Sequence, residues 1–179
     1  MATISTRTLV ESVMKNLIVI FIAIAVALLC VDNSYAQQGT AKPQAFNQQA
    51  FEQVKQKYLG KKWLLLLWSV DCPPCIKELA LVQKLQQQKA NLAVVIINVD
   101  TGEESELQRR EVVEHFDLAR HTHLYFREGF EDHSRYLIDP QWFGELPRSY
   151  FIDEMGIFHG KSGLVAKALL EKWLLAENA

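Results

Sequence analysis

The sequence predicts an α/β domain in which a central mixed sheet is flanked by helices. Apolar runs suited to buried strands alternate with helical patterns, which implies right-handed parallel crossovers within one sheet. The run over residues 92–99 is continuous and rich in β-branched residues, as expected of a strand that is covered on both faces. Residues 149–152 and 157–159 flank an Asp-Glu-Met-Gly turn, which predicts an antiparallel hairpin beside the parallel strands.

The first 36 residues have the pattern of a secretory signal peptide. Arg7 and Lys15 precede an uninterrupted apolar run at residues 17–31, and Ser34-Tyr35-Ala36 follows as a cleavage site. The run is shorter than the ~20 apolar residues of a comfortable transmembrane helix, so cleavage after Ala36 is favoured over an uncleaved membrane anchor. We therefore expect an exported protein.

The rest of the chain has the length of one domain. Residues 37–49 are polar, contain Gly39 and Pro43, and predict a flexible linker, so the domain is expected over residues 50–179. The signal segment holds two basic and two acidic residues, so the formal net charge is −2 with or without it. This balance argues against nucleic acid as a partner, because nucleic-acid-binding domains present a basic face.

Helical patterns occur before, between and after the expected strands. One ends at Gly60, which suits a C-cap, and the others cover about residues 73–89, 103–118, 130–137 and the segment after residue 163. The residues expected to face the core from these helices are Ala50, Phe51, Val54, Tyr58, Leu59, Leu79, Val82, Leu85, Leu107, Val113, Phe116, Leu164, Ala168, Leu169 and Trp173. The Glu and Arg residues of the 103–118 helix are expected on a solvated face. A further short strand is expected at residues 121–126.

Two cysteines lie where the buried strand of residues 63–68 ends and a helix begins. Cys72 falls at or near the helix N-cap, where unpaired backbone N–H groups and the helix dipole favour an anion. A thiolate there has a lowered pKa and becomes the nucleophile of thiol–disulfide exchange. Cys75, one turn later, is placed to attack the resulting mixed disulfide. Pro73 and Pro74 suit a first helical turn, where their missing N–H groups would be unpaired.

The same cysteine spacing also occurs in zinc sites and structural disulfides. A zinc site needs two further ligands, and no second Cys-x-x-Cys or Cys-x-x-His follows. A disulfide across a two-residue loop gains little chain-entropy stabilisation. Cys30 lies in the export signal, which leaves Cys72 and Cys75 as the cysteines of the mature protein. The favoured interpretation is a redox-active Cys72–Cys75 disulfide that needs no metal or other cofactor.

The segment from Trp68 to Leu79 resembles the active site of the thioredoxin-like TlpA-type thiol-disulfide oxidoreductases, which are exported or membrane-tethered bacterial proteins. The segment from Gly144 to Gly156 resembles that family's second motif, in which a cis-proline opens a strand. The resemblance implies a thioredoxin-like fold, a periplasmic location and protein thiols or disulfides as substrates. It also implies a membrane partner that supplies electrons and hence a reductase, while an oxidase stays open because direction follows relative potentials.

This chain departs from the family pattern beside the cysteines. Asp71 stands where the family usually has Trp, and its negative charge should raise the pKa of the neighbouring thiolate. Leu66 stands where thioredoxin carries a buried Asp that relays protons, so the usual base for Cys75 is absent. Glu78, one turn after Cys75, could transfer a proton through water, although a solvated acid near the helix N-terminus is the favoured interpretation.

The resemblance also assigns a role to Pro147, which lies at the start of a predicted strand. A cis Leu146–Pro147 bond would pack against the cysteine pair and leave the backbone of Leu146 free to bind an extended substrate segment. Trp68, Trp142 and Phe143 could form an apolar rim that binds substrate around the dithiol. Core or loop packing explains each of these three aromatic residues equally well.

A second hypothesis is a copper-delivery or assembly protein that uses the two thiolates as soft Cu(I) ligands. A degenerate binding module without either activity is a third. His121 and His123 would share a face of a strand and could hold a metal, but no third ligand lies close in sequence. Surface histidines are therefore the favoured interpretation of this pair.

Overall fold

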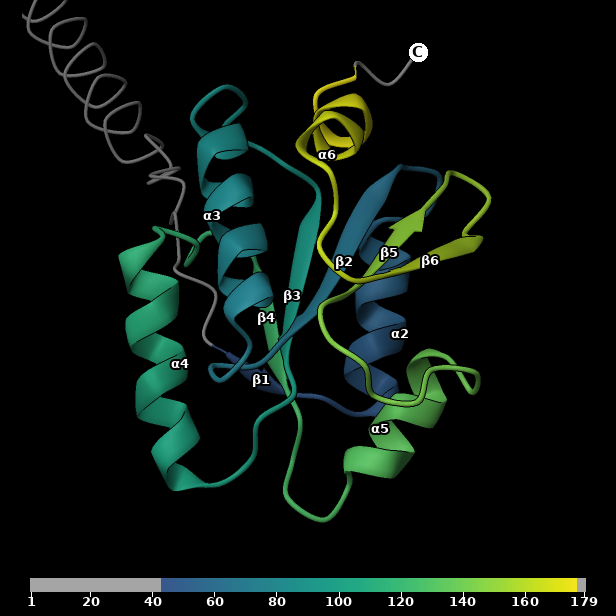
Figure 1. Ribbon diagram of the computed structural model, residues 1–179. Coiled ribbons are helices and arrows are strands. Elements are labelled where there is room, and N and C mark those ends of the chain that lie inside the picture. The colour runs from purple at the N-terminus through teal and green to yellow at the C-terminus, as the bar shows by residue number, and fades with distance from the viewer. Residues whose placement is uncertain (1–42, 177–179) are drawn as a thin grey trace, which may run out of the picture. The chain divides into compact units, whose positions relative to one another are not determined.

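The computed structural model describes residues 43–176 (Figure 1). The strands are β1 (Gln44–Ala45), β2 (Trp63–Trp68), β3 (Val94–Asn98), β4 (Thr122–Tyr125), β5 (Arg148–Ile152) and β6 (Phe158–Ser162). The helices are α2 (Gln48–Lys57), α3 (Pro73–Gln86), α4 (Glu103–His115), α5 (Glu131–Ile138) and α6 (Lys167–Leu174). None of these helices has the length and apolarity needed to span a bilayer. The expected signal segment and residues 37–42 of the expected linker lie outside the described residues.

All six strands within residues 43–176 form one sheet, in the order β1-β4-β3-β2-β5-β6. Four of them, β1, β4, β3 and β2, are parallel, while β5 runs antiparallel to β2 and pairs with β6 as a hairpin. The predicted mixed sheet flanked by helices is confirmed.

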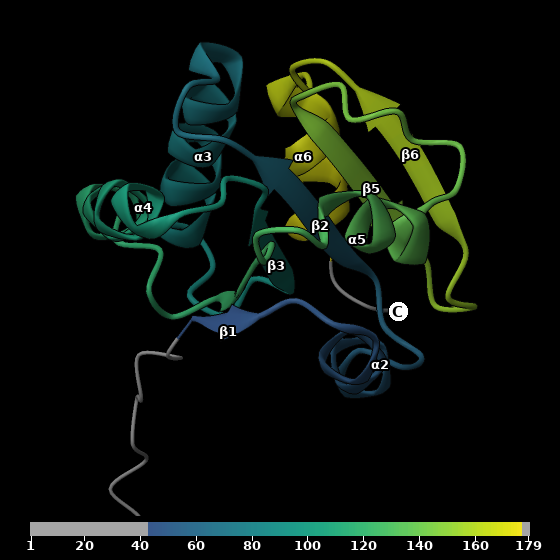
Figure 2. The ribbon, with the colours of Figure 1, turned by 90° about the horizontal axis from the view of Figure 1, so that it is seen from below.

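Side chains of β2 alternate between two hydrophobic cores, one on each face of the sheet. Leu64 and Leu66 pack on one face with α3, α4 and α6. Trp63 and Leu65 pack on the other face with α2 and α5. Figure 2 shows α3 and α6 on the opposite side of the sheet from α2. Because both faces are covered, all six residues of β2 are buried, which explains its continuous apolar sequence.

The folded region begins before the expected boundary at residue 50. Gln44 and Ala45 pair in parallel with β4, and Phe46 is buried against the rings of Phe51 and Phe126. The side chain of Asn47 accepts a hydrogen bond from the backbone N–H of Ala50 and so caps α2. Residues 43–49, the part of the expected linker that the structure describes, therefore contain a strand, a helix cap and the first residues of α2.

Several of the expected core-facing residues are exposed. Leu59 lies beyond the end of α2 and is 69% exposed, and Leu107 on α4 is 50% exposed. Near the C-terminus Leu164, Ala168 and Leu169 are exposed, whereas Val165, Leu170 and Leu174 are buried. Leu164 lies before α6, which begins only at Lys167, and the face of α6 that is buried is the one with Leu170 and Leu174, not the one with Ala168 and Leu169.

Candidate active site

The two cysteines form a disulfide at the N-terminus of α3. Cys72 is the N-cap residue, and Pro73 and Pro74 occupy the first helical positions, as predicted. The backbone N–H of Cys75 points at the Sγ of Cys72 at 3.3 Å, so a helix donor faces that sulfur. Cys72 is 8% exposed and Cys75 is 1% exposed. Cys72 is thus the more exposed residue of the pair.

The loop that leads to the cysteines is held by a polar network from β3 and α4. Asp100 accepts hydrogen bonds from the backbone N–H of Val70 and from the Nδ2 of Asn98, both at 2.8 Å. Asn98 in turn accepts from Arg109, whose guanidinium lies over the ring of Tyr125. This network positions the segment just before Cys72.

The expectation of a solvated face is wrong for Arg109, which is 7% exposed. Its guanidinium donates a hydrogen bond to the Oδ1 of Asn98, which lies eleven residues earlier in the chain, on β3. The signal in the sequence was Asn98, a polar residue inside an otherwise apolar run.

Glu78 is buried rather than solvated, with 2% of its surface exposed. The hydroxyl of Ser149 donates to its Oε1 at 2.5 Å, while Oε2 has no hydrogen-bond partner among the described residues. Burial raises the pKa of the Glu78 carboxyl, and the hydrogen bond from Ser149 and the nearby backbone N–H of Val165 oppose this shift only in part. A carboxyl group held in this way stays protonated to a higher pH than a solvated one.

Glu78 supplies a buried carboxyl group that β2 itself lacks. Leu66 is 2% exposed and pairs with Ser149 across β2 and β5, so the two side chains share a face of the sheet. Because Ser149 bonds to Glu78, the carboxyl group of α3 lies over the sheet at the level of Leu66. Cys75 and Glu78 are also three residues apart on α3, which places them on one side of the helix.

The Leu146–Pro147 peptide bond is cis, as the motif predicted. In the β2–β5 register Leu67 pairs with Arg148, so Pro147 lies beside Trp68 at the end of β2 that leads to Cys72. Leu146 is half-buried and packs against the core cluster that contains both cysteines. Within residues 43–176 the backbone of Leu146 makes no hydrogen bond to another backbone group.

Arg148 fixes the segment on the other side of Pro147. Its guanidinium bonds to Asp139 at 3.0 Å and to the hydroxyl of Ser162 at 2.7 Å, and it also lies 3.4 Å from a carboxylate oxygen of Glu145. Gly160 on β6 leaves the space for it, because a Cβ at that position would lie 2.4 Å from Nη2 of Arg148.

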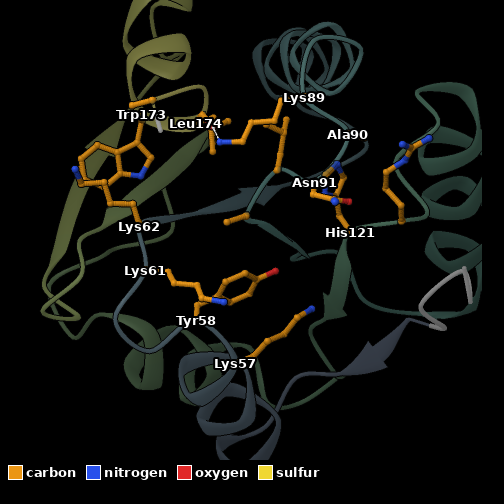
Figure 3. Close-up of a pocket in the computed structure, with 14 residues that line it drawn as sticks. Lys57, Tyr58, Lys61, Lys62, Lys89, Ala90, Asn91, His121, Trp173 and Leu174 are labelled. Carbon is orange, nitrogen blue, oxygen red and sulfur yellow. Dashed lines mark hydrogen bonds between the residues drawn. The ribbon is translucent and has the colours of Figure 1, made fainter. Parts of the chain in front are cut away.

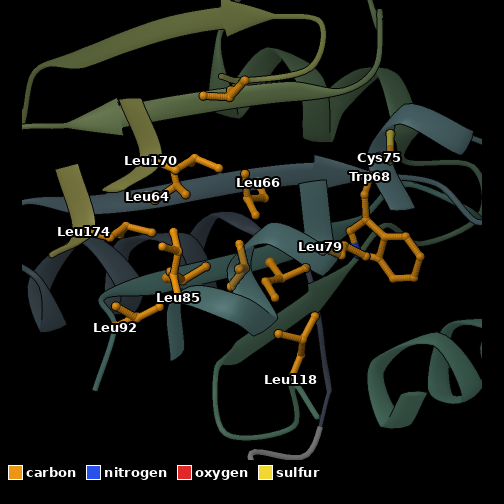
Figure 4. Close-up of a cluster of buried hydrophobic side chains, with 14 of the residues drawn as sticks. Leu64, Leu66, Trp68, Cys75, Leu79, Leu85, Leu92, Leu118, Leu170 and Leu174 are labelled. Atoms are coloured by element: carbon orange, nitrogen blue, oxygen red, sulfur yellow. The ribbon is translucent and has the colours of Figure 1, made fainter. Parts of the chain in front are cut away.

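Only one of the three aromatic residues expected at the rim is exposed. Trp68 is buried in the core between β2 and α3, close to Cys75 and Leu79 (Figure 4). Trp142 is buried too, and its indole N–H donates to the backbone oxygen of Glu145. Phe143 is 88% exposed and lies four residues before Pro147. Packing in the core therefore accounts for the first two residues, and Phe143 alone is left as a surface group.

The expectation that His121 and His123 are surface residues is wrong. They are 3% and 4% exposed, and they contact Gln86 and the backbone oxygen of Leu118. Burial, with the neighbouring His123, lowers the pKa of His121 to about 4. β4 is parallel to β3 and β3 to β2, so His121, which directly precedes β4, lies at the end of the sheet opposite to the cysteines. His123 pairs with Ile96 in the middle of β3. No group of three or more metal-ligating side chains is found within residues 43–176.

No family model matches the chain. Among curated proteins it is similar to thioredoxin-like protein YneN of Bacillus subtilis (strain 168), with 33% identity over 99 residues. The matched stretch makes up 55% of this chain and 54% of the relative, so the chain spans about half the length of that protein.

Solved structures show the fold. A thiol:disulfide interchange protein of the thioredoxin family from Chlorobium tepidum TLS is 18% identical, with a TM-score of 0.50 over 66% of this chain and 80% of that one. A DsbF homologue from Corynebacterium diphtheriae is 15% identical, with a TM-score of 0.50 over 66% and 73%. The chain has a thioredoxin-like fold, as the resemblance of its two motifs implied.

Proposed function

We propose that this protein is an exported thiol–disulfide oxidoreductase that exchanges electrons with cysteines of other proteins through Cys72 and Cys75, and that it acts as a reductase. The observation that carries the proposal is the Cys72–Cys75 disulfide at a helix N-terminus. The similarity to a thioredoxin-like protein supports the same class of reaction.

In the reductive direction the reaction begins with Cys72 as a thiolate and Cys75 as a thiol. The Cys72 sulfur attacks one sulfur of a substrate disulfide, forms a mixed disulfide and releases the other substrate sulfur as a thiolate. The Cys75 sulfur then loses its proton and attacks the Cys72 sulfur. The Cys72–Cys75 disulfide forms, the second substrate thiolate leaves, and two electrons have passed to the substrate.

Glu78 is our candidate for the group that takes the proton from Cys75. Its carboxyl is buried three residues further along α3, and burial raises its pKa, which makes its carboxylate a stronger base than a solvated one. Ser149 holds the carboxyl group in place through Oε1. The second oxygen, which has no hydrogen-bond partner among the described residues, is the one available for the proton.

Leu146 is our candidate for the group that binds the substrate backbone. Its N–H and C=O make no backbone hydrogen bond within residues 43–176, and it packs against the cluster of the two cysteines. An extended substrate segment would pair with these groups as an added strand. The exposed ring of Phe143 supplies an apolar contact nearby in the chain.

Export to the periplasm is supported by the signal-like pattern of residues 1–36, and a membrane electron donor by the family resemblance. If residues 1–36 are retained rather than cleaved, they tether the protein to the membrane.

The test is reduction of insulin disulfides by the full chain, together with the redox potential of the cysteine pair against glutathione. Cys72→Ser should abolish turnover, whereas the control Cys30→Ser should keep it. A potential near that of thioredoxin, about −270 mV, supports a reductase, and one near that of DsbA, about −120 mV, supports an oxidase. Tight Cu(I) binding without exchange activity would instead favour the copper carrier.

A further inference from the structure

A cavity of about 510 Å³ lies at the end of the sheet opposite to the dithiol. Its walls come from the end of α2, the segment between α3 and β3, the residues before β4, and the end of α6 (Figure 3). Lys62, at the edge of the cavity, directly precedes β2, and Cys72 follows the other end of that strand. The six residues of β2 span roughly 17 Å, so the cavity and the dithiol are at least that far apart along the strand. Figure 4 shows the same separation, because Leu92 and Leu174, which line the cavity, lie at the far end of the core from Cys75.

The cavity collects positive charge. None of its lining residues within the described chain is acidic, and five are basic, namely Lys57, Lys61, Lys62, Lys89 and Arg120. The formal net charge of the whole chain is −2, so this concentration of cations does not follow from a basic composition.

Three of the five cations lack a compensating carboxylate. Lys62 pairs with Glu154, and Arg120 pairs with Asp117. For Lys57, Lys61 and Lys89, no carboxylate within residues 43–176 lies at ion-pair distance.

Neutral oxygens hold two of these three ammonium groups in place. The Nζ of Lys57 donates to the hydroxyl of Thr122 at 2.8 Å, and that of Lys89 donates to the backbone oxygen of Leu174 at 3.1 Å. These hydrogen bonds fix the two groups without neutralising them. The cavity therefore holds preplaced positive charge.

Helix ends explain only part of this arrangement. The C-termini of α2, α3 and α6 lie around the cavity, and a helix C-terminus attracts cations. Lys57 is in the last turn of α2 and fits this explanation. Lys89 donates to the backbone oxygen of Leu174, the last residue of α6, and fits it as well. Lys61 lies outside the helices and pairs with no carboxylate within residues 43–176, so it exceeds what the helix ends require.

We propose that this cavity binds a phosphate-bearing ligand, with Lys57, Lys61 and Lys89 as its charge partners. Lysine ammonium groups bind phosphate as point charges, and three of them together favour a multivalent phosphate over a singly charged anion. The volume lies within the range of small-molecule sites. The phosphate can belong to a free small molecule or to a lipid headgroup, since both present the same chemistry.

The first experiment is a calorimetric titration of inorganic pyrophosphate into the full chain at low and physiological salt. We expect saturable binding that the double variant Lys57→Gln/Lys61→Gln weakens at least tenfold. Lys161→Gln on β6, which removes the same kind of charge outside the cavity, should leave binding unchanged. Insulin reduction should be equal in all three proteins, because the cavity is remote from the dithiol.

The second experiment separates the two sources of phosphate. Vesicles of phosphatidylglycerol are compared with vesicles of phosphatidylcholine, using the same three proteins. Binding to phosphatidylglycerol that depends on Lys57 and Lys61, without binding of pyrophosphate, identifies a headgroup site. If neither probe binds, or if Lys161→Gln weakens binding as much as the double variant, the proposal is wrong.

Discussion

Glu78 places an ionisable group in the core, and its effect on stability has a definite sign. Burial raises the pKa of this carboxyl above the ordinary value of 4.5, so above that pH the folded state holds a proton that the unfolded state has lost. Stability then falls as pH rises through the raised pKa. We predict that Glu78→Gln removes this fall, as measured by denaturant unfolding of both proteins at a series of pH values. Parallel curves for the two proteins would contradict the prediction.

The same substitution tests the proposed proton transfer. Gln keeps the shape of the side chain and can still accept the hydrogen bond from Ser149, but it cannot take a proton. We therefore expect the release of substrate by Cys75 to slow about tenfold or more, in the lower range of general-base effects. Trapping the mixed disulfide shows whether that step is the one affected. If the variant releases substrate from the mixed disulfide at an unchanged rate while the pH dependence of its stability is altered, Glu78 has a structural role only.

His121 acts on stability in the opposite direction. Its folded-state pKa of about 4 lies below the ordinary value of 6.5, so between these values the unfolded state binds more protons. Stability should fall by about 3 kcal/mol as pH drops from 6.5 to 4, and His121→Gln should lessen this loss. Gln can keep a hydrogen bond to Gln86, so the fold is retained. If the variant loses as much stability between pH 6.5 and 4 as the unmodified protein, His121 is not the source of that loss.

At the scale of elements, the loop between β2 and α3 depends on β3. Asp100 holds the backbone of Val70, two residues before Cys72, and also the side chain of Asn98. We predict that Asp100→Ala lowers the free energy of unfolding by about 1–3 kcal/mol, because two donors lose their acceptor. The rate of thiol–disulfide exchange should fall as well, since the loop before Cys72 loosens.

Glu104→Ala is the matched control for this substitution. Glu104 lines the same surface hollow as Asp100 and carries the same charge, but it is exposed. It should leave both stability and rate nearly unchanged. Equal effects of the two substitutions would indicate that charge, and not the hydrogen bonds to Val70 and Asn98, is responsible.

For the molecule as a whole, Phe46 anchors the segment between β1 and α2 to the core. It is 2% exposed and packs against Phe51 and Phe126, although it lies in a segment whose composition resembles a linker. Phe46→Ala should lower the free energy of unfolding by about 3–5 kcal/mol, as expected for loss of a buried aromatic side chain. The control Phe143→Ala removes an 88% exposed ring and should change stability little. Thermal or denaturant unfolding measures both.

Local signals in the sequence were sufficient for much of the fold. The strand of residues 63–68 was predicted with the bounds that β2 has, because Lys62 and Ser69 flank a run that is apolar throughout. The cysteine pair at a helix N-terminus was also predicted from local signals, whereas the cis Leu146–Pro147 bond was predicted only from the family resemblance.

The errors concern residues whose surroundings come from distant parts of the chain. Glu78 is buried because Ser149, 71 residues later, bonds to it. Arg109 is buried because Asn98 and Tyr125 receive its guanidinium. Periodicity assigns such polar residues to solvent, because it registers polarity without the partner that satisfies it.

Gly160 illustrates a constraint that surface exposure alone conceals. It is exposed, it lies on the edge strand β6, and its φ angle is not positive. Judged by exposure and backbone conformation alone, the position would accept any residue. A methyl group at this position would nevertheless displace Arg148, which is anchored by Asp139 and Ser162 beside Pro147. A randomised library selected for redox turnover should therefore be enriched in glycine at position 160.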